Sequence, residues 1–186
     1  MIGYALCGSF CTIAQSLEQL KKLVDKKYDI LPIVSFNVYD LDTRFWKAEE
    51  LKKELKEICG RDIIHTIEEA EPLGPKLVLD ALIISPCTGN TLSKLANGIT
   101  DTPVTMAAKA HLRADRPLLI ALSSNDAMSA NLKNIAVMLE KKCVYFVPMK
   151  QDDPINKPHS LSAEFSEIPT ALDAALAGKQ LRKLFI

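Results

Sequence analysis

Residues 80–101 read Asp-Ala-Leu-Ile-Ile-Ser-Pro-Cys-Thr-Gly-Asn-Thr-Leu-Ser-Lys-Leu-Ala-Asn-Gly-Ile-Thr-Asp. An uninterrupted apolar run at 81–84 is typical of a strand that is covered on both faces of a parallel sheet. Pro86 has no backbone N–H, so we expect it to end that strand. Leu92 and Leu95 then recur at helical spacing. The stretch therefore predicts a buried strand, a polar turn and a helix.

The turn of this stretch carries small polar side chains. Thr88 or Asn90 can cap the helix, which leaves free N–H groups and the positive end of the helix dipole facing outward. At the carboxyl end of a parallel strand, such groups suit an anionic or polar planar ligand. A capped turn is also required in any strand–turn–helix unit. Both a structural turn and a binding turn are consistent with these residues.

The composition indicates one globular domain, residues 1–186. Hydrophobic residues make up 48% and charged residues 25% of the chain, which is ordinary for such a domain. The 23 basic and 23 acidic residues balance, which argues against nucleic acid or a membrane surface as partner. With three His, we expect no multi-histidine metal site. No signal peptide or membrane span is evident, and the five scattered Cys favour reduced thiols in a cytoplasm.

Apolar runs alternate with amphipathic helical patterns along the chain. Strands are expected near 2–6, 30–36, 62–67, 81–85, 117–122 and 144–147, helices near 13–27, 46–59, 92–97, 103–113, 130–142 and 168–184, and loops at 37–45 and 151–165. Such alternation predicts a three-layer α/β/α Rossmann-like domain with a parallel sheet. The polar clusters that follow four of the strands should then converge on one crevice.

A Gly-Ser turn follows the first strand. Glycine lets a ligand approach the backbone, while Ser and Thr hydroxyls and a helix N-terminus can hold a phosphate, so Gly8, Ser9 and Thr12 are candidates. The loop is neither a dinucleotide fingerprint nor a Walker loop, because the required glycine and lysine spacings are absent. Ser35 ends the second strand and faces the same crevice in this arrangement.

The turn and the segments after it resemble two related families. Residues 86–91 and 94–101 are similar to the Pro-Ala-Ser-Ala-Asn-Thr motif and its continuation in the flavin-containing cysteine decarboxylases. The Cys-Thr-Gly variant, together with residues 103–113, 146–148 and 151–154, is more similar to the family of dipicolinate synthase B subunits. The resemblance implies six strands in the order 3-2-1-4-5-6 and homo-oligomers built from trimers.

The resemblance also implies site residues. FMN is the implied cofactor, and the residues expected to bind it are Gly8, Ser9, Thr12, Ser35, Cys87, Thr88, Asn90, Thr91, Ser123 and Ser124. His65 and Asn125 are the expected catalytic residues, since the decarboxylases have a His before the motif strand and an Asn after the following strand. The interval from His65 to the motif is longer here, and a packed or surface histidine is the alternative interpretation.

The resemblance implies an oxidoreductase subunit. The implied reaction is the oxidation of a dihydrodipicolinate precursor to dipicolinate (pyridine-2,6-dicarboxylate) in the cytoplasm of the mother cell during sporulation. A partner A subunit would bind NADP and accept the hydride. An FMN-dependent decarboxylase is one alternative, although Ser123 and Ser124 depart from that family's pattern. A non-catalytic scaffold that binds the A subunit is another.

Overall fold

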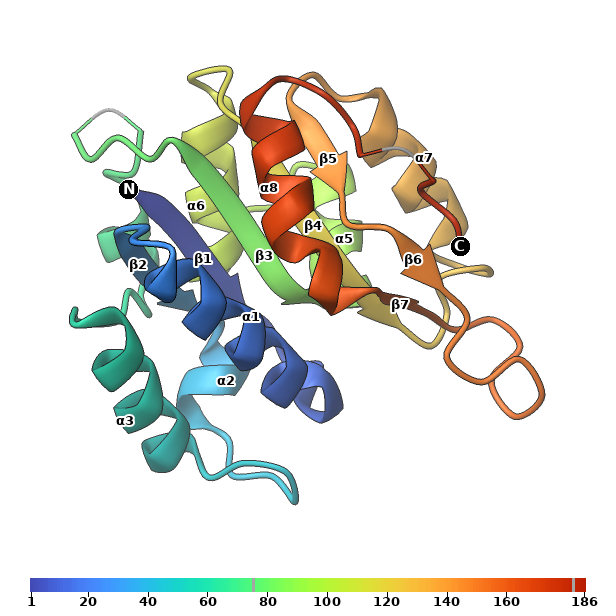
Figure 1. The fold of residues 1–186 in the computed structure, drawn as a ribbon, viewed down its shortest axis with the longest axis horizontal. Helices are drawn as coiled ribbons and strands as arrows, with labels where there is room; N and C mark the ends of the chain where they lie inside the picture. Colours follow the sequence, from blue (N-terminus) through green and yellow to red (C-terminus); the bar gives the residue numbers. More distant parts are fainter. Residues whose placement is uncertain (75, 182) are drawn as a thin grey trace.

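The computed structural model describes residues 1–74, 76–181 and 183–186, and the strands found there form one seven-stranded sheet (Figure 1). The strands are β1 (Ile2–Leu6), β2 (Ile30–Val34), β3 (Ala81–Cys87), β4 (Leu118–Ser124), β5 (Val144–Phe146), β6 (Met149–Lys150) and β7 (Leu161–Ala163). The order β2-β1-β3-β4-β5 is parallel throughout. β7 pairs antiparallel with both β4 and β6.

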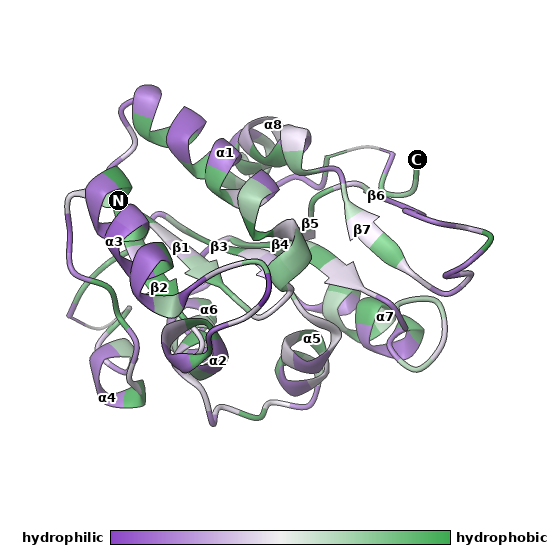
Figure 2. Ribbon diagram, turned by 90° about the horizontal axis from the view of Figure 1, so that it is seen from below, coloured by the Kyte–Doolittle hydropathy of each residue, from purple (hydrophilic) through white to green (hydrophobic). Residues whose placement is uncertain are grey.

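Helices cover both faces of this sheet (Figure 2). The helices are α1 (Ile13–Asp25), α2 (Phe36–Asp40), α3 (Ala48–Cys59), α4 (Ile67–Ala70), α5 (Gly89–Ala96), α6 (Pro103–Leu112), α7 (Leu132–Glu140) and α8 (Ile168–Leu176), with 3-10 turns at Phe10–Thr12 and Phe165–Glu167. The face with α1, α3 and α8 packs around Tyr4 and Ile83, and the face with α5, α6 and α7 packs around Ala5 and Ile84. In the described part of the chain, no helix has the length and apolarity needed to cross a membrane.

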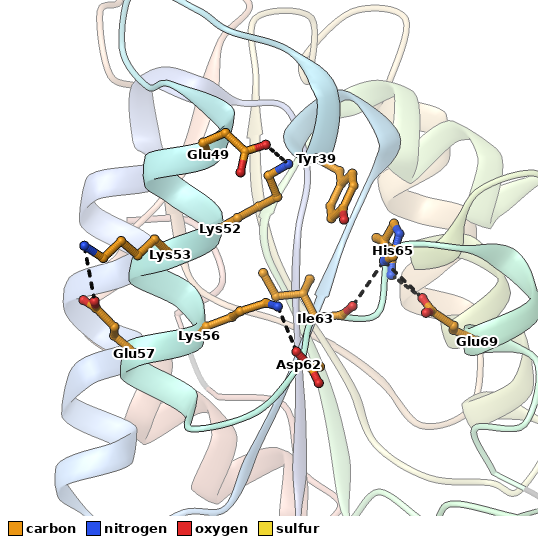
Figure 3. Close-up of a pocket in the computed structure, with 10 residues that line it drawn as sticks. All are labelled: Tyr39, Glu49, Lys52, Lys53, Lys56, Glu57, Asp62, Ile63, His65 and Glu69. Carbon is orange, nitrogen blue, oxygen red and sulfur yellow. Dashed lines mark hydrogen bonds and ion pairs between the residues drawn. The ribbon is translucent and has the colours of Figure 1, made fainter.

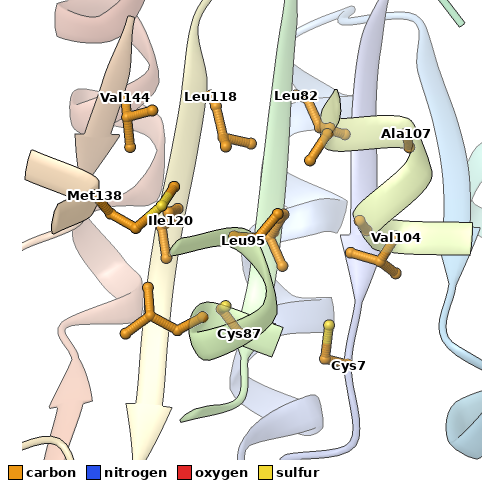
Figure 4. Close-up of a cluster of buried hydrophobic side chains, with 14 of the residues drawn as sticks. Cys7, Leu82, Cys87, Leu95, Val104, Ala107, Leu118, Ile120, Met138 and Val144 are labelled. Carbon is orange, nitrogen blue, oxygen red and sulfur yellow. The ribbon is translucent and has the colours of Figure 1, made fainter. Parts of the chain in front are cut away.

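The side chains of each strand point alternately to the two faces of the sheet, and so contribute to two separate cores. All five residues of β1 and all seven of β3 are buried. Figure 4 shows the α5–α6–α7 core, in which Leu95 and Val104 lie over the sheet and Cys7 and Cys87 lie at the strand ends. The three-layer α/β/α Rossmann-like fold is therefore confirmed, with a sheet that is mostly parallel and has antiparallel pairs at β7.

The expected strand order is largely confirmed, with one strand reduced. The segment expected as the third strand, 62–67, contributes a single parallel bridge between Ile64 and Ile33. It therefore lies beside β2 as expected, but it does not form a strand of several paired residues. Thr66 then caps α4 by accepting a hydrogen bond from the backbone N–H of Glu69 (3.2 Å), which turns the chain away from the sheet.

Two strand predictions are corrected. β3 does not end at Pro86 but runs through it to Cys87, because the Pro86 carbonyl still accepts a hydrogen bond from the N–H of Cys7 (3.1 Å). The register of β3 with β4 shifts between Ile84 and Cys87, on either side of this proline. The expected loop 151–165 contains β7, which pairs with the end of β4 beyond the reach of β5.

Two helix predictions also differ from the structure. The final helix ends at Leu176 rather than near 184, since Gly178 has a left-handed φ of 71° that terminates it. Part of the segment 37–45, expected to be a loop, belongs to α2. Ser35 is the residue that precedes the first turn of this helix. Gly60 ends α3 in the left-handed conformation (φ 63°), as glycine commonly does after a helix.

Candidate functional site

The carboxyl ends of β1 to β4 lie along one edge of the sheet and border a crevice with two cavities. The first, of about 340 Å³, is lined by Ser35, Asn90, Thr91 and Lys94 among others, and is called here the Ser35 cavity. The second, of about 460 Å³, is lined by Ser9, Ser123, Ser124, Asn125 and Asp126 among others, and is called here the Ser124 cavity. Gly8 and Thr88 line both, so the two cavities adjoin at the centre of the crevice.

Thr88 is the cap of α5. Its Oγ1 accepts a hydrogen bond from the backbone N–H of Thr91 (3.1 Å) and donates to the Thr91 hydroxyl (3.0 Å). The Thr91 hydroxyl in turn contacts the buried Cys7 sulfur at 3.3 Å. Of the two caps that the sequence allowed, Thr88 is the one used, and Asn90 is left exposed at the wall of the Ser35 cavity.

A chain of hydroxyl groups joins β1 to β4. The Thr12 hydroxyl donates to the Ser9 carbonyl (2.9 Å) and lies 3.1 Å from the Ser9 hydroxyl, which donates to the Ser123 hydroxyl (3.1 Å). Ser9 and Ser123 are 114 residues apart in sequence, so only the fold brings them together. Thr12 acts on this cluster through Ser9 and lines neither cavity.

Ser35 carries a polar atom without a partner. Its Oγ is buried and has no hydrogen-bond partner among the described residues, while other parts of Ser35 line the Ser35 cavity. Leaving such a buried hydroxyl unsatisfied costs about 1–3 kcal/mol. A polar group of a ligand in this cavity would remove that cost.

The end of β4 holds a carboxylate that sequence reasoning did not select. Asp126 accepts a hydrogen bond from the Ser124 hydroxyl (2.5 Å) and from the Asn131 amide (2.9 Å to each oxygen). The Ser124 bond, with help from Asn131, lowers the pKa of the Asp126 carboxyl below its usual value. Its position directly after Asn125 at a strand end was the only sequence signal. Gly89 lets α5 approach this group closely.

Cys87 lies beneath the crevice rather than in it. The side chain is fully buried in the α5–α6–α7 core and borders neither cavity (Figure 4). Burial raises the pKa of Cys7 to about 11 and raises that of Cys87 well above its usual value, so both stay protonated thiols at neutral pH. Cys87 therefore supports the turn from below, where it packs under Thr88.

His65 lies in a separate pocket of about 650 Å³ (Figure 3). Its ring stacks on Tyr39 with centroids 3.9 Å apart, and its Nδ1 lies 3.2 Å from the Glu69 carboxylate. Lys52 covers the Tyr39 ring at 4.2 Å. This pocket shares no lining residue with either cavity of the crevice. The fold of one chain therefore brings Asn125 to the crevice but not His65.

Comparisons with known proteins agree in family and fold. A family model described as "Flavoprotein" matches residues 1–174. The dipicolinate synthase B subunit of Bacillus subtilis (strain 168) is 42% identical over 185 residues, covering 100% of this chain and 92% of that protein. The crystal structure of the dipicolinate synthase B subunit from Bacillus halodurans superposes with a TM-score of 0.91 at 40% identity, covering 100% and 95% of the two chains.

A more distant structure shares the fold alone. An FMN-dependent cysteine decarboxylase superposes with a TM-score of 0.68 at 23% identity, covering 94% of this chain and 95% of that one. A flavin prenyltransferase of Thermoplasma acidophilum is 30% identical over 86 residues, which cover 42% of this chain and 48% of that protein.

Proposed function

The chain belongs to the flavoprotein family, and from that premise we propose that it acts as the B subunit of a dipicolinate synthase. In this role it takes part in the oxidation of a dihydrodipicolinate precursor to dipicolinate. The observation that carries the proposal is the 42% identity to a protein of that name over 185 residues, an alignment that covers 100% of this chain. The crevice at the strand ends is the site to which we assign the reaction.

The crevice is suited to FMN. Ser35, whose buried hydroxyl has no partner among the described residues, lines a cavity whose other wall is the capped N-terminal turn of α5. Gly8, Ser9 and Thr88 would hold the phosphate, because glycine backbone and hydroxyl donors stand there beside a helix N-terminus. Ser123 and Ser124 would lie against the flat ring. Bound FMN would supply a flat, redox-active ring.

Further parts of the proposal concern the assembly. We infer a partner A subunit that binds NADP, and homo-oligomers of this chain built from trimers. Asn125 lines the crevice and is a proposed catalytic residue. His65 faces a separate pocket, so a catalytic role for it requires the crevice of a neighbouring copy. We place the reaction in the cytoplasm of the mother cell during sporulation.

Reconstitution tests the function. The purified chain, the A subunit and NADP are combined with the dihydrodipicolinate precursor, and dipicolinate is followed by its ultraviolet absorbance. We expect the full rate only when both subunits are present. An equal rate from the A subunit alone would contradict the proposal.

A charge substitution separates a working crevice from a scaffold. Ser9→Asp should abolish FMN binding, followed by flavin fluorescence, because a carboxylate beside the phosphate repels it. Ser166→Asp is the matched control, since Ser166 is exposed in the 3-10 turn Phe165–Glu167 that precedes α8. If Ser9→Asp keeps the full synthase rate and the same affinity for the A subunit, the chain is a scaffold.

A further inference from the structure

The Asp126 carboxylate is held rigidly at the wall of the Ser124 cavity. Its Oδ1 accepts hydrogen bonds from Ser124 (2.5 Å) and from the Asn131 amide (2.9 Å), and its Oδ2 accepts the same amide at 2.9 Å. The Asn131 amide is itself oriented, because its oxygen accepts a hydrogen bond from the buried Asn134 (2.8 Å). The orientation of the charge is thus set before any ligand arrives, which is how enzymes use charges most effectively.

One oxygen of this carboxylate still has room for a ligand. A carboxylate oxygen can accept two hydrogen bonds, and Oδ2 accepts only the amide that it shares with Oδ1. Asp126 borders the Ser124 cavity together with Ser9 and Thr88, so a flat molecule placed there lies against the carboxylate.

The two cavities differ in charge. The Ser35 cavity is lined by both Lys94 and Asp101, whose opposite charges pair at 2.9 Å and offset each other. Among the residues described at the wall of the Ser124 cavity, Asp126 is the charged side chain, and no Lys, Arg or His is present there. The Ser35 cavity therefore carries no net charge from its lining residues, whereas a positive charge is favoured in the Ser124 cavity.

The carboxylate is better suited to hold charge than to accept a proton. The hydrogen bond from Ser124 lowers its pKa, so it is ionised at neutral pH and is a weak base. A general base works best when its pKa lies near the working pH. A fixed negative charge, in contrast, lowers the energy of any transition state in which positive charge appears beside it.

We propose that Asp126 stabilises the positive charge that develops on the substrate ring during oxidation, which rests on the function proposed above. A hydride leaves a ring carbon with its electron pair and passes to the nicotinamide-class acceptor carried by the partner subunit. The ring then carries one additional positive charge. Loss of a ring proton to water gives the neutral aromatic pyridine. Asp126 attracts the ring at the charged stage and offers no such attraction to the ring of the reactant, and this difference is the condition for a gain in rate.

A pair of ligands tests this charge preference without catalysis. Dipicolinate and N-methylpyridinium-2,6-dicarboxylate have similar shapes, and only the second carries a positive ring. The wild-type assembly should bind the cationic ligand at least tenfold more tightly by calorimetry, about 1.4 kcal/mol. Asp126→Asn should abolish the preference. Asp115→Asn, the control with the same change in net charge, should keep it, because Asp115 lies on the surface beside Lys142.

The kinetics of the same variants give an independent readout. Asp126→Asn should lower kcat at least tenfold and leave KM unchanged or lower, since the carboxylate repels the substrate carboxylates in the ground state. A purely structural role would instead raise KM and lower the melting temperature. A cation preference that persists in Asp126→Asn, or failure of both ligands to bind the wild type, overturns the inference. A wild type that shows the preference but makes no dipicolinate with the A subunit overturns the proposed function and leaves the charge site intact.

Discussion

Gly89→Ala should destabilise the chain, although Gly→Ala within a helix usually adds stability. Gly89 is the first residue of α5 and packs against the end of β4. A Cβ added there would lie 2.3 Å from the Ser124 hydroxyl, 2.6 Å from the Asn131 amide and 2.8 Å from the Asp126 carboxylate. All three distances are shorter than a Cβ tolerates, so all three side-chain groups, or the start of α5 itself, must shift.

The size of the effect follows from which groups can move. Asn131 is buried and bonded to Asn134, so it can give only slightly, and the closer Ser124 must rotate and give up its hydrogen bond to Asp126. Overpacking of this kind costs about 1–3 kcal/mol. Loss of the hydrogen bond adds about 1 kcal/mol, since the carboxylate is partly exposed to solvent. The higher helix propensity of Ala than of Gly offsets at most about 1 kcal/mol of this loss. We expect a net loss of about 1–3 kcal/mol.

Urea unfolding followed by circular dichroism measures this loss. The double variant Gly89→Ala/Ser124→Ala should recover part of it, because the nearest clashing atom is then gone. Asn90→Ala is the matched control in the same helical turn, where the side chain is exposed and is not the cap. A Gly89→Ala protein as stable as the wild type would show that α5 does not press on the carboxylate, and the reasoning would be refuted.

Three further changes test the capped turn, the buried histidine and the free hydroxyl. Thr88→Ala should cost about 1 kcal/mol in urea unfolding and Thr88→Ser much less, because Ser can still cap; equal losses would contradict the cap. Burial lowers the pKa of His111, whose Nε2 bonds the Pro117 carbonyl (2.8 Å), so the unfolded chain takes up the proton more readily and stability should fall as the pH drops below about 6.5. His111→Gln should flatten that dependence in thermal melts, and an unchanged slope would assign it to other groups. Ser35→Ala should leave the free chain as stable or up to about 1 kcal/mol more stable while weakening FMN binding; unchanged binding would remove Ser35 from the site.

Much of the crevice could be predicted from local patterns. Ser9, Thr88 and Ser123 each follow an apolar run that forms a buried parallel strand, and parallel strands end at the same edge. The same rule placed Ser35 and Asn125 at the crevice wall. The order of strands came from the family resemblance, which the comparisons confirm.

Other features depend on partners that are distant in sequence. Whether Cys87 faces the cavity or the core depends on how α5 packs over the end of β3, and it faces the core. His65 follows the bridge beside β2, and stacking on Tyr39 holds it in another pocket. Asp126 becomes a fixed charge only through Ser124, Asn131 and the close approach of Gly89. No periodic pattern encodes such contacts.

The sequence by itself thus determined the layers of the fold, the polar strand ends and the family, because strand burial, helix periodicity and turn chemistry are local properties of the chain. The tertiary structure alone decided which strand-end residues share a cavity. It further decided that the Cys87 thiol lies in the core beneath the crevice and that the Asp126 carboxylate supplies the negative charge at the wall of the Ser124 cavity. It also decided that residues 161–163 form a strand that pairs with Ser123 and Ser124. The physical reason is that hydrogen bonds and close packing between distant segments exist only once the chain has folded.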